Sequence, residues 1–163
     1  MGQGQTGGTP IIQRWVYQRI IDNRIYSDKP IHQQGMQLVR DYRVSVLFDQ
    51  IACIYVKDKA LVNTFHPHEP DKEWYHMLNA NTDEFSVSEL NKILSFARKM
   101  NIDFAEVDVL RDNGTGNLYI IDVNNIPAAS LFKGLSQAVK KDAFQRHVNI
   151  IDAKISNFVR RWE

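Results

Sequence analysis

Alternating apolar and polar positions mark two pairs of segments that predict antiparallel β-hairpins. In the first pair, residues 41–49 and 51–57 are rich in β-branched and aromatic side chains and meet at Phe48-Asp49-Gln50. In the second pair, residues 104–110 and 118–124 flank a turn that carries two glycines. Segments of this composition, bounded by turn residues, are typical of paired strands. We therefore expect two hairpins within one antiparallel sheet.

Three further segments are less regular. Residues 11–21 are β-branched and aromatic and predict a strand before the first hairpin, and residues 60–65 predict a fourth strand after it. Residues 67–83 are rich in Pro, Asp, Asn and His without a clear period. This composition indicates a loop, with a short helical turn at residues 74–78.

Two segments have the spacing of amphipathic helices. Ser86 and Glu89 form a capping-box pattern before apolar residues at helical spacing, which predicts a helix over residues 87–100 that covers the sheet. Residues 137–162 predict a long second helix. Its apolar stripe consists of Val148, Ile151, Ile155, Phe158, Val159 and Trp162. We interpret the stripe as core packing, with a subunit interface as the alternative. The expected fold class is α+β, an antiparallel sheet covered by helices.

Composition agrees with one compact domain and excludes several classes of protein. The 163 residues suffice for one core, and 44% hydrophobic and 24% charged residues are ordinary for globular proteins. A formal net charge of +1, with both signs interspersed, makes nucleic acid an unexpected partner. No apolar run is long enough to span a bilayer, so no membrane partner is expected. Cys53, the only cysteine, favours an inert buried thiol and a cytoplasmic location.

Oxygen-bearing side chains of the second hairpin have the parity to lie on one face. Successive side chains of a strand point to opposite faces, so Glu106 shares a face with Asp108, and Asp122 shares one with Asn124. If the two segments pair around the glycine turn, Asp108 can lie opposite Asp122 and Glu106 opposite Asn124, and a slip of one residue would separate them. Facing carboxylates repel unless a cation offsets their charge. Two carboxylates and an amide suit Mg²⁺, which also takes phosphate and water oxygens. The alternative is an ordinary hairpin with solvated acids.

Two stretches of the chain resemble the C-terminal signature of ATP-grasp enzymes, which are ATP-dependent carboxylate ligases. The stretches are NIDFAEVDVL at residues 101–110 and LYIIDVNNIP at residues 118–127. The resemblance implies that Asp108, Asp122 and Asn124 hold one or two Mg²⁺ ions against the phosphates of ATP. It covers residues 15–135 and is specific only at this metal motif.

A looser resemblance upstream implies further contacts with ATP. Residues 41–57 resemble the hairpin that precedes the metal strands, where Asp41 would hold the ribose and Arg43 and Lys57 would face the phosphates. For Arg43 and Lys57, a solvated strand position is the alternative. Residues 15–21 resemble the strand that enters the hinge, where backbone groups read adenine. The implied adenine positions are Gln18, Arg19, Ile20 and Ile21.

The chain also departs from the family pattern. Glu106 and Ala128 stand where many of these ligases have Arg and Gly, so the family's substrate does not transfer. The glycine-rich residues 1–10 contain no lysine and are expected to be a linker. Residues 11–163 are expected to form the C-terminal lobe, with the N-terminal nucleotide lobe missing or supplied by a partner chain.

The expected function is therefore the magnesium-binding part of an ATP-dependent ligase. Such an enzyme would join a small-molecule carboxylate to an amine or thiol through an acyl phosphate, with ATP and Mg²⁺ as cofactors. The lobe is expected to be inactive by itself, and its oligomeric state is open. The alternative is a non-catalytic binding or scaffolding domain that derives from this fold and lacks the nucleotide lobe.

Overall fold

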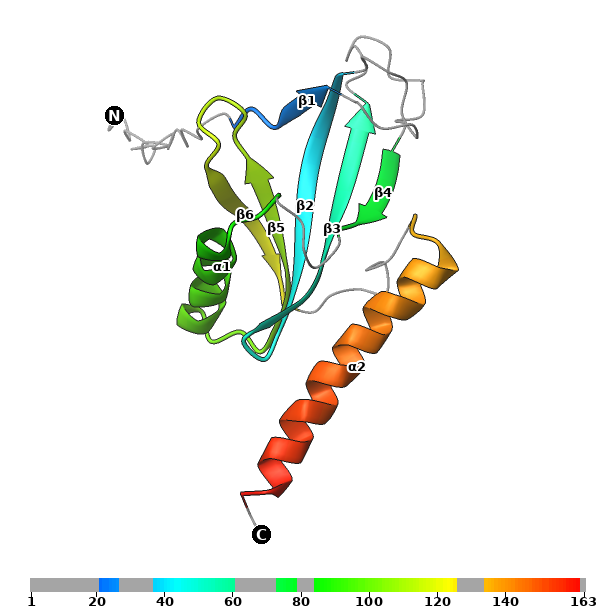
Figure 1. The fold of residues 1–163 in the computed structure, drawn as a ribbon. Coiled ribbons are helices and arrows are strands. Elements are labelled where there is room, and N and C mark those ends of the chain that lie inside the picture. The colour runs from blue at the N-terminus through cyan, green and yellow to red at the C-terminus, as the bar shows by residue number, and fades with distance from the viewer. Residues whose placement is uncertain (1–20, 27–36, 61–72, 79–83, 126–133, 162–163) are drawn as a thin grey trace, which may run out of the picture.

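The computed structural model describes residues 21–26, 37–60, 73–78, 84–125 and 134–161. They form an α+β fold in which a six-stranded antiparallel sheet carries two helices (Figure 1). The strands are β1 (Arg24–Tyr26), β2 (Gln37–Leu47), β3 (Gln50–Ala60), β4 (Glu73–Met77), β5 (Phe104–Arg111) and β6 (Leu118–Asn124), and the helices are α1 (Val87–Lys99) and α2 (Gln137–Val159). The strand order is β4-β3-β2-β5-β6, and β1 also pairs with β2. The expected fold class is confirmed.

Both predicted hairpins are present. β2 and β3 pair antiparallel across a tight turn at Phe48 and Asp49, which have φ values of 46° and 64°. β5 and β6 pair antiparallel on either side of the glycine-bearing turn. The first helix begins after the predicted cap, because Ser86 and Glu89 make both hydrogen bonds of the capping box.

The helical turn expected at residues 74–78 is wrong. Glu73–Met77 is strand β4, which pairs with β3 and sets Tyr75 opposite Lys57. Pairing with β3 satisfies the backbone of this aromatic segment, and that contact outweighs the loop-like composition around it. Ile21 lies in no strand. The predictions for residues 11–20 and 61–65 fall outside the described residues.

One face of the sheet builds the main hydrophobic core together with α1. Alternate residues of β2, β3 and β5 point to this face, and Ile93 and Ala97 are the buried residues of α1. The buried cluster consists of Tyr42, Val44, Val46, Ile54, Val56, Leu78, Phe85, Ile93, Ala97, Val107 and Val109. Burial of each large apolar side chain contributes about 1.5–3 kcal/mol. The expectation that the first helix covers the sheet is confirmed.

A β-bulge in β6 changes which of its side chains point to the core face of the sheet. Asp108 pairs with Asp122 and Val109 with Ile120, so Ile121 is an extra residue in β6. Because a bulge shifts the alternation by one residue, Val123 and Ile120 both pack against the core. The same shift leaves Ile121 47% exposed, beside the polar positions of the strand.

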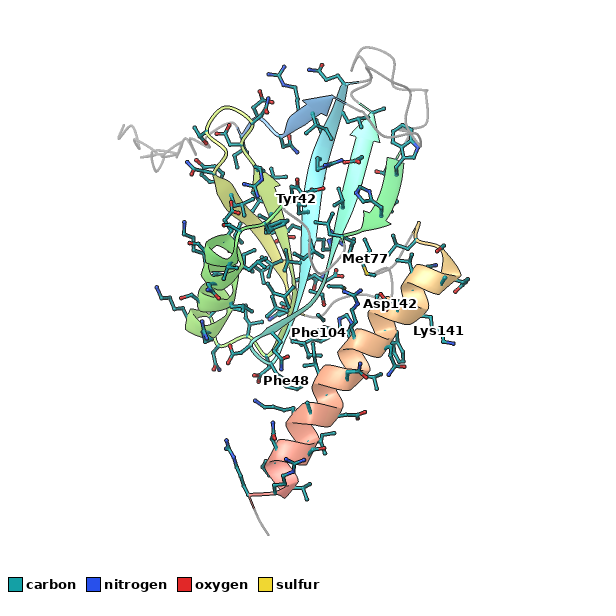
Figure 2. The ribbon with its side chains drawn as sticks, in the orientation of Figure 1. Tyr42, Phe48, Met77, Phe104, Lys141 and Asp142 are labelled. Carbon is teal, nitrogen blue, oxygen red and sulfur yellow. The ribbon has the colours of Figure 1, made fainter. Side chains whose placement is uncertain are left out.

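The buried residues of the second helix lie in its N-terminal half, and farther along Lys154 Nζ lies 5.3 Å from the centroid of the Phe48 ring at the β2–β3 turn. Ala143 and His147 are its buried residues, and His147 Nε2 lies 2.7 Å from Ser45 Oγ. Figure 2 shows Met77 and Phe104 on the side of the sheet next to α2. Farther along, Ile155 and Phe158 are 56% and 61% exposed within the described part of the chain. The interpretation of the apolar stripe as core packing is therefore wrong for this half, and the subunit interface stays a prediction.

Neither described helix is long and apolar enough to cross a membrane. The helix α2 has the length but carries charged residues along its whole course, including Lys140, Asp142 and Lys154.

An ion pair at the start of α1 predicts loss of stability in acid. Arg111 Nη1 donates to Glu89 Oε1 over 2.8 Å, and this hydrogen bond lowers the pKa of Glu89 to about 2. A carboxyl whose folded pKa lies below its unfolded value stabilises the fold above that unfolded value, and the stabilisation is lost as the pH falls through the folded pKa. We expect the free energy of unfolding to fall between about pH 5 and pH 2.

The variant Glu89→Gln isolates this effect, because glutamine preserves the capping box and removes the charge. Urea denaturation should show a less stable variant at about pH 6, with the difference shrinking toward about pH 2.5. A difference that stays constant over this range would contradict the assignment to the Glu89 charge.

Candidate functional site

The face of the sheet opposite the α1 core is polar near its centre. Arg43 and Lys57 occupy strand positions that alternate with the core residues Val44 and Val56. The register sets Asp41 opposite Lys57. It also sets Arg43 between Tyr55 on β3 and Asp108 on β5. These side chains border a small pocket of about 50 Å³, which is lined by Asp41, Tyr42, Arg43, Tyr55, Lys57, Asp108 and Ile121.

The predicted register of the second hairpin is confirmed. Asp108 lies opposite Asp122, and Glu106 lies opposite Asn124. Asp122 and Asn124 are both exposed, whereas Asp108 is half-buried. The hairpin therefore presents two carboxylates and one amide on the face that carries the pocket. Asp108 lines the pocket, whereas Asp122 and Asn124 are open to solvent.

Arg43 holds the inner carboxylate of this set. Its Nε and Nη2 donate to the two oxygens of Asp108 over 2.5 and 2.9 Å, from directly across the β2–β5 pair. A two-bond fork of this kind is the strongest arrangement that arginine forms with a carboxylate. The hydrogen bonds to Asp108 raise the pKa of Arg43, so the guanidinium stays charged.

Glu106 is the buried acid of the polar face. Its side chain is 2% exposed, and Oε1 accepts a hydrogen bond from the Tyr55 hydroxyl over 2.5 Å. The second oxygen, Oε2, lies 3.4 Å from Arg43 Nη1. Burial raises the pKa of Glu106, because the ionised form loses its hydration.

The other two predicted ATP contacts also have carboxylate or amide partners. Lys57 Nζ lies 2.8 Å from Glu73 Oε1, and the side-chain hydrogen bond from this lysine lowers the pKa of Glu73. Asp41 Oδ1 accepts a hydrogen bond from Asn23 Nδ2 over 2.9 Å. Burial raises the pKa of Asp41. The pocket thus gathers Asp41, Arg43 and Lys57 on one face, and their contacts with ATP stay predictions.

Sequence reasoning missed three side chains of this face. Tyr55 shares its strand parity with Lys57, so the alternation already used for the metal residues could have found it. Glu73 and Tyr75 were not found, because their segment was interpreted as a loop with a helical turn. Tyr75 donates a hydrogen bond to Glu73 over 2.5 Å, which fixes the partner of Lys57.

The donor set fits an open magnesium site rather than a closed one. In the part of the chain that the structure describes, no three His, Cys, Asp or Glu side chains converge closely enough to hold an ion by themselves. Mg²⁺ commonly takes one or two carboxylates and completes its shell with phosphate and water oxygens. Asp122 and Asn124, exposed on β6, have the chemistry for that role, and Asp108 is held by Arg43.

Of the predicted adenine positions, only Ile21 lies within the described residues, where it is half-buried and in no strand. Gln18, Arg19 and Ile20 fall outside them.

Comparisons with known proteins gave structural matches only. No protein-family model matches the chain, and no curated protein matches it. The chain is similar to the ATP-grasp ligase PsnB complexed with a minimal precursor, with a TM-score of 0.47 and 13% identity over 70% of this chain and 37% of that one. It is also similar to the macrocyclase MdnC bound with the precursor peptide MdnA from Microcystis aeruginosa MRC, with a TM-score of 0.46 and 7% identity over 72% and 34% of the two chains. The chain thus spans well under half the length of either protein, and over about 70% of its own length it is similar in structure to an ATP-grasp ligase.

Proposed function

We propose that this chain is the C-terminal, magnesium-binding part of an ATP-dependent carboxylate ligase. The observation that carries the proposal is the register of the β5–β6 hairpin, which sets Asp108 opposite Asp122 and brings Asn124 to the same edge. Arg43 on β2 and Lys57 on β3 lie on the same face and line the pocket together with Asp108. A face with three oxygen donors and two cations suits a magnesium–polyphosphate complex, which carries both positive and negative charge.

Each residue has a role that follows from its charge and exposure. Asp122 and Asn124 would offer oxygens to Mg²⁺ from the solvent side, and Asp108 would complete the protein's share of the ligands. A bound Mg²⁺ neutralises phosphate charge and aligns the phosphoryl group for transfer to a carboxylate. Arg43 and Lys57 would hold phosphate oxygens, the first as a planar fork and the second as a point charge. Asp41 would bind the ribose.

The complete enzyme is part of the same proposal. The reaction would join a carboxylate to an amine or thiol through an acyl phosphate, and the phosphate-binding lobe would come from elsewhere in the protein or from a partner chain. A small-molecule carboxylate as substrate and the adenine contact at residues 18–21 stay predictions. We expect this chain alone to bind MgATP weakly or not at all, which calorimetric titration would measure.

The metal assignment is tested most directly with paramagnetic Mn²⁺, which accepts the same oxygen ligands as Mg²⁺. In a spectrum of the ¹⁵N-labelled chain, substoichiometric Mn²⁺ should first broaden the amide signals of Asp108, Asp122 and Asn124. Excess Mg²⁺ should restore them. Asp152, an exposed acid on α2, is the internal control for non-specific binding and should keep its signal. Broadening that is uniform, or that centres on another group of acids, would contradict the proposed site.

A further inference from the structure

The guanidinium of Arg43 occupies both oxygens of a proposed magnesium ligand. Asp108 accepts the two-bond fork over 2.5 and 2.9 Å, so a metal ion would have to share both oxygens with the positively charged guanidinium while the fork is in place. Without a cation, the facing carboxylates Asp108 and Asp122 would repel each other. Arg43 therefore performs in this structure the charge compensation that a metal ion would perform.

A second acceptor for Arg43 lies within reach. Glu106 Oε2 is 3.4 Å from Arg43 Nη1, a distance too long for a strong hydrogen bond. The Tyr55 hydroxyl fixes the other oxygen of Glu106 from the β3 side. Burying a carboxylate is costly unless it is paired, and this one is 2% exposed. Closer pairing with Arg43 would lower that cost.

We propose that Arg43 is an exchangeable internal cation that holds Asp108 in the metal-free chain and moves from Asp108 toward Glu106 when a divalent cation binds. The inference rests on the proposed magnesium site and assigns it a regulatory element. The side chain has room for the movement, because Arg43 is 38% exposed and borders the pocket. Its backbone need not move, since Glu106 and Asp108 share one face of β5.

The exchange makes metal binding weaker than the ligand set alone would allow. A divalent cation has to compete with the guanidinium for Asp108, because both oxygens of this carboxylate accept hydrogen bonds from Arg43. Hydrogen bonds between charged groups are strong enough for this competition to lower the affinity by at least about tenfold. Free Mg²⁺ is then held weakly. Phosphate oxygens attract both Mg²⁺ and Arg43, so they favour the state in which the metal ion is bound and Arg43 has left Asp108.

The unmodified chain provides the first test. With arginine side chains ¹⁵N-labelled, the Nε–H resonance of Arg43 reports directly on its bond to Asp108. We expect this resonance to shift during titration with MgCl₂, with the same midpoint as the amides of Asp122 and Asn124. If those amides respond and the Arg43 Nε–H signal does not, the exchange is overturned and the metal site stands. If neither responds, the metal site itself fails, and the exchange fails with it.

Variants provide the second test, with Mn²⁺ affinity measured by electron paramagnetic resonance. Arg43→Met removes the competing cation, and we expect it to raise affinity for Mn²⁺ by about tenfold or more. Arg43→Lys preserves the charge without the fork and should fall between Arg43→Met and the wild type. Lys57→Met is the matched control, since it removes one positive charge from the same pocket, where Lys57 pairs with Glu73. An equal rise in Arg43→Met and Lys57→Met would show a general charge effect and overturn the proposal. If an Arg43 variant fails to fold, the Arg43 Nε–H resonance of the wild-type chain decides whether Arg43 leaves Asp108.

Discussion

Replacing Asp122 or Asn124 with alanine is expected to lower ATP turnover by at least about a hundredfold in the enzyme that contains this chain, while the fold survives. The magnitude follows from loss of an oriented group that stabilises transition-state charge. The fold should survive because both side chains are exposed on strand β6, where substitutions usually change stability by about 0.5 kcal/mol or less. Removing Asp122 also removes a like charge opposite Asp108.

The measurement is steady-state release of ADP, with circular dichroism and thermal unfolding of each variant beside it. Asp103→Ala is the matched control, because Asp103 is an exposed acid just before strand β5 and away from the pocket. It should retain wild-type turnover. Full turnover in both Asp122→Ala and Asn124→Ala would contradict the metal assignment. It would favour a binding or scaffolding domain.

Asp58→Ala is expected to destabilise the chain by about 3–5 kcal/mol, the usual cost of removing one partner from a buried ion pair. Asp58 is fully buried, and Arg40 donates to its two oxygens from Nε and Nη2 over 2.7 and 2.9 Å. The two residues face each other across the β2–β3 pair. Without the aspartate, the Arg40 guanidinium, which is only 12% exposed, loses its bidentate partner and stays away from water.

Urea denaturation measures this loss as a shift of the unfolding midpoint at constant slope. The double variant Arg40→Met with Asp58→Leu is the matched control, because replacing both charges with apolar groups of similar size is often neutral or stabilising. It should recover most of the stability. A loss below about 1 kcal/mol in Asp58→Ala would mean that the pair behaves like a solvent-exposed salt bridge. The expectation of a buried pair would then be wrong.

The hairpins and the first helix were predictable because their signals are local. The turn residues and the period of two indicate that Asp108 faces Asp122, and a slip of one residue would move the apolar set off the core. The bulge at Ile121, which changes the pairing nearer the turn, is not visible in that period. The Ser86–Glu89 cap is likewise contained in four consecutive residues. The strand β4 was missed because its evidence lies outside its own sequence. Glu73–Met77 becomes a strand through pairing with β3.

The apolar stripe of α2 shows the limit of periodicity. Its spacing correctly predicted a helix, but Ile151, Ile155 and Phe158 are exposed in the described structure. Period specifies which side chains share a helix face, and it does not specify what that face contacts. The buried residues of the helix lie in its first half, where His147 meets Ser45.

The sequence by itself determined the α+β class, the two hairpins and the register that places Asp108 opposite Asp122. Each of these follows from interactions between residues close along the chain. The tertiary structure alone decided that Arg43 holds Asp108 and that Glu106 is buried beside Tyr55. Those contacts require β2 to lie between β3 and β5. This arrangement brings together residues that are about sixty positions apart in the sequence. Such pairings are selected by the packing of the whole core, because the free energy that favours them belongs to buried surface shared by many residues.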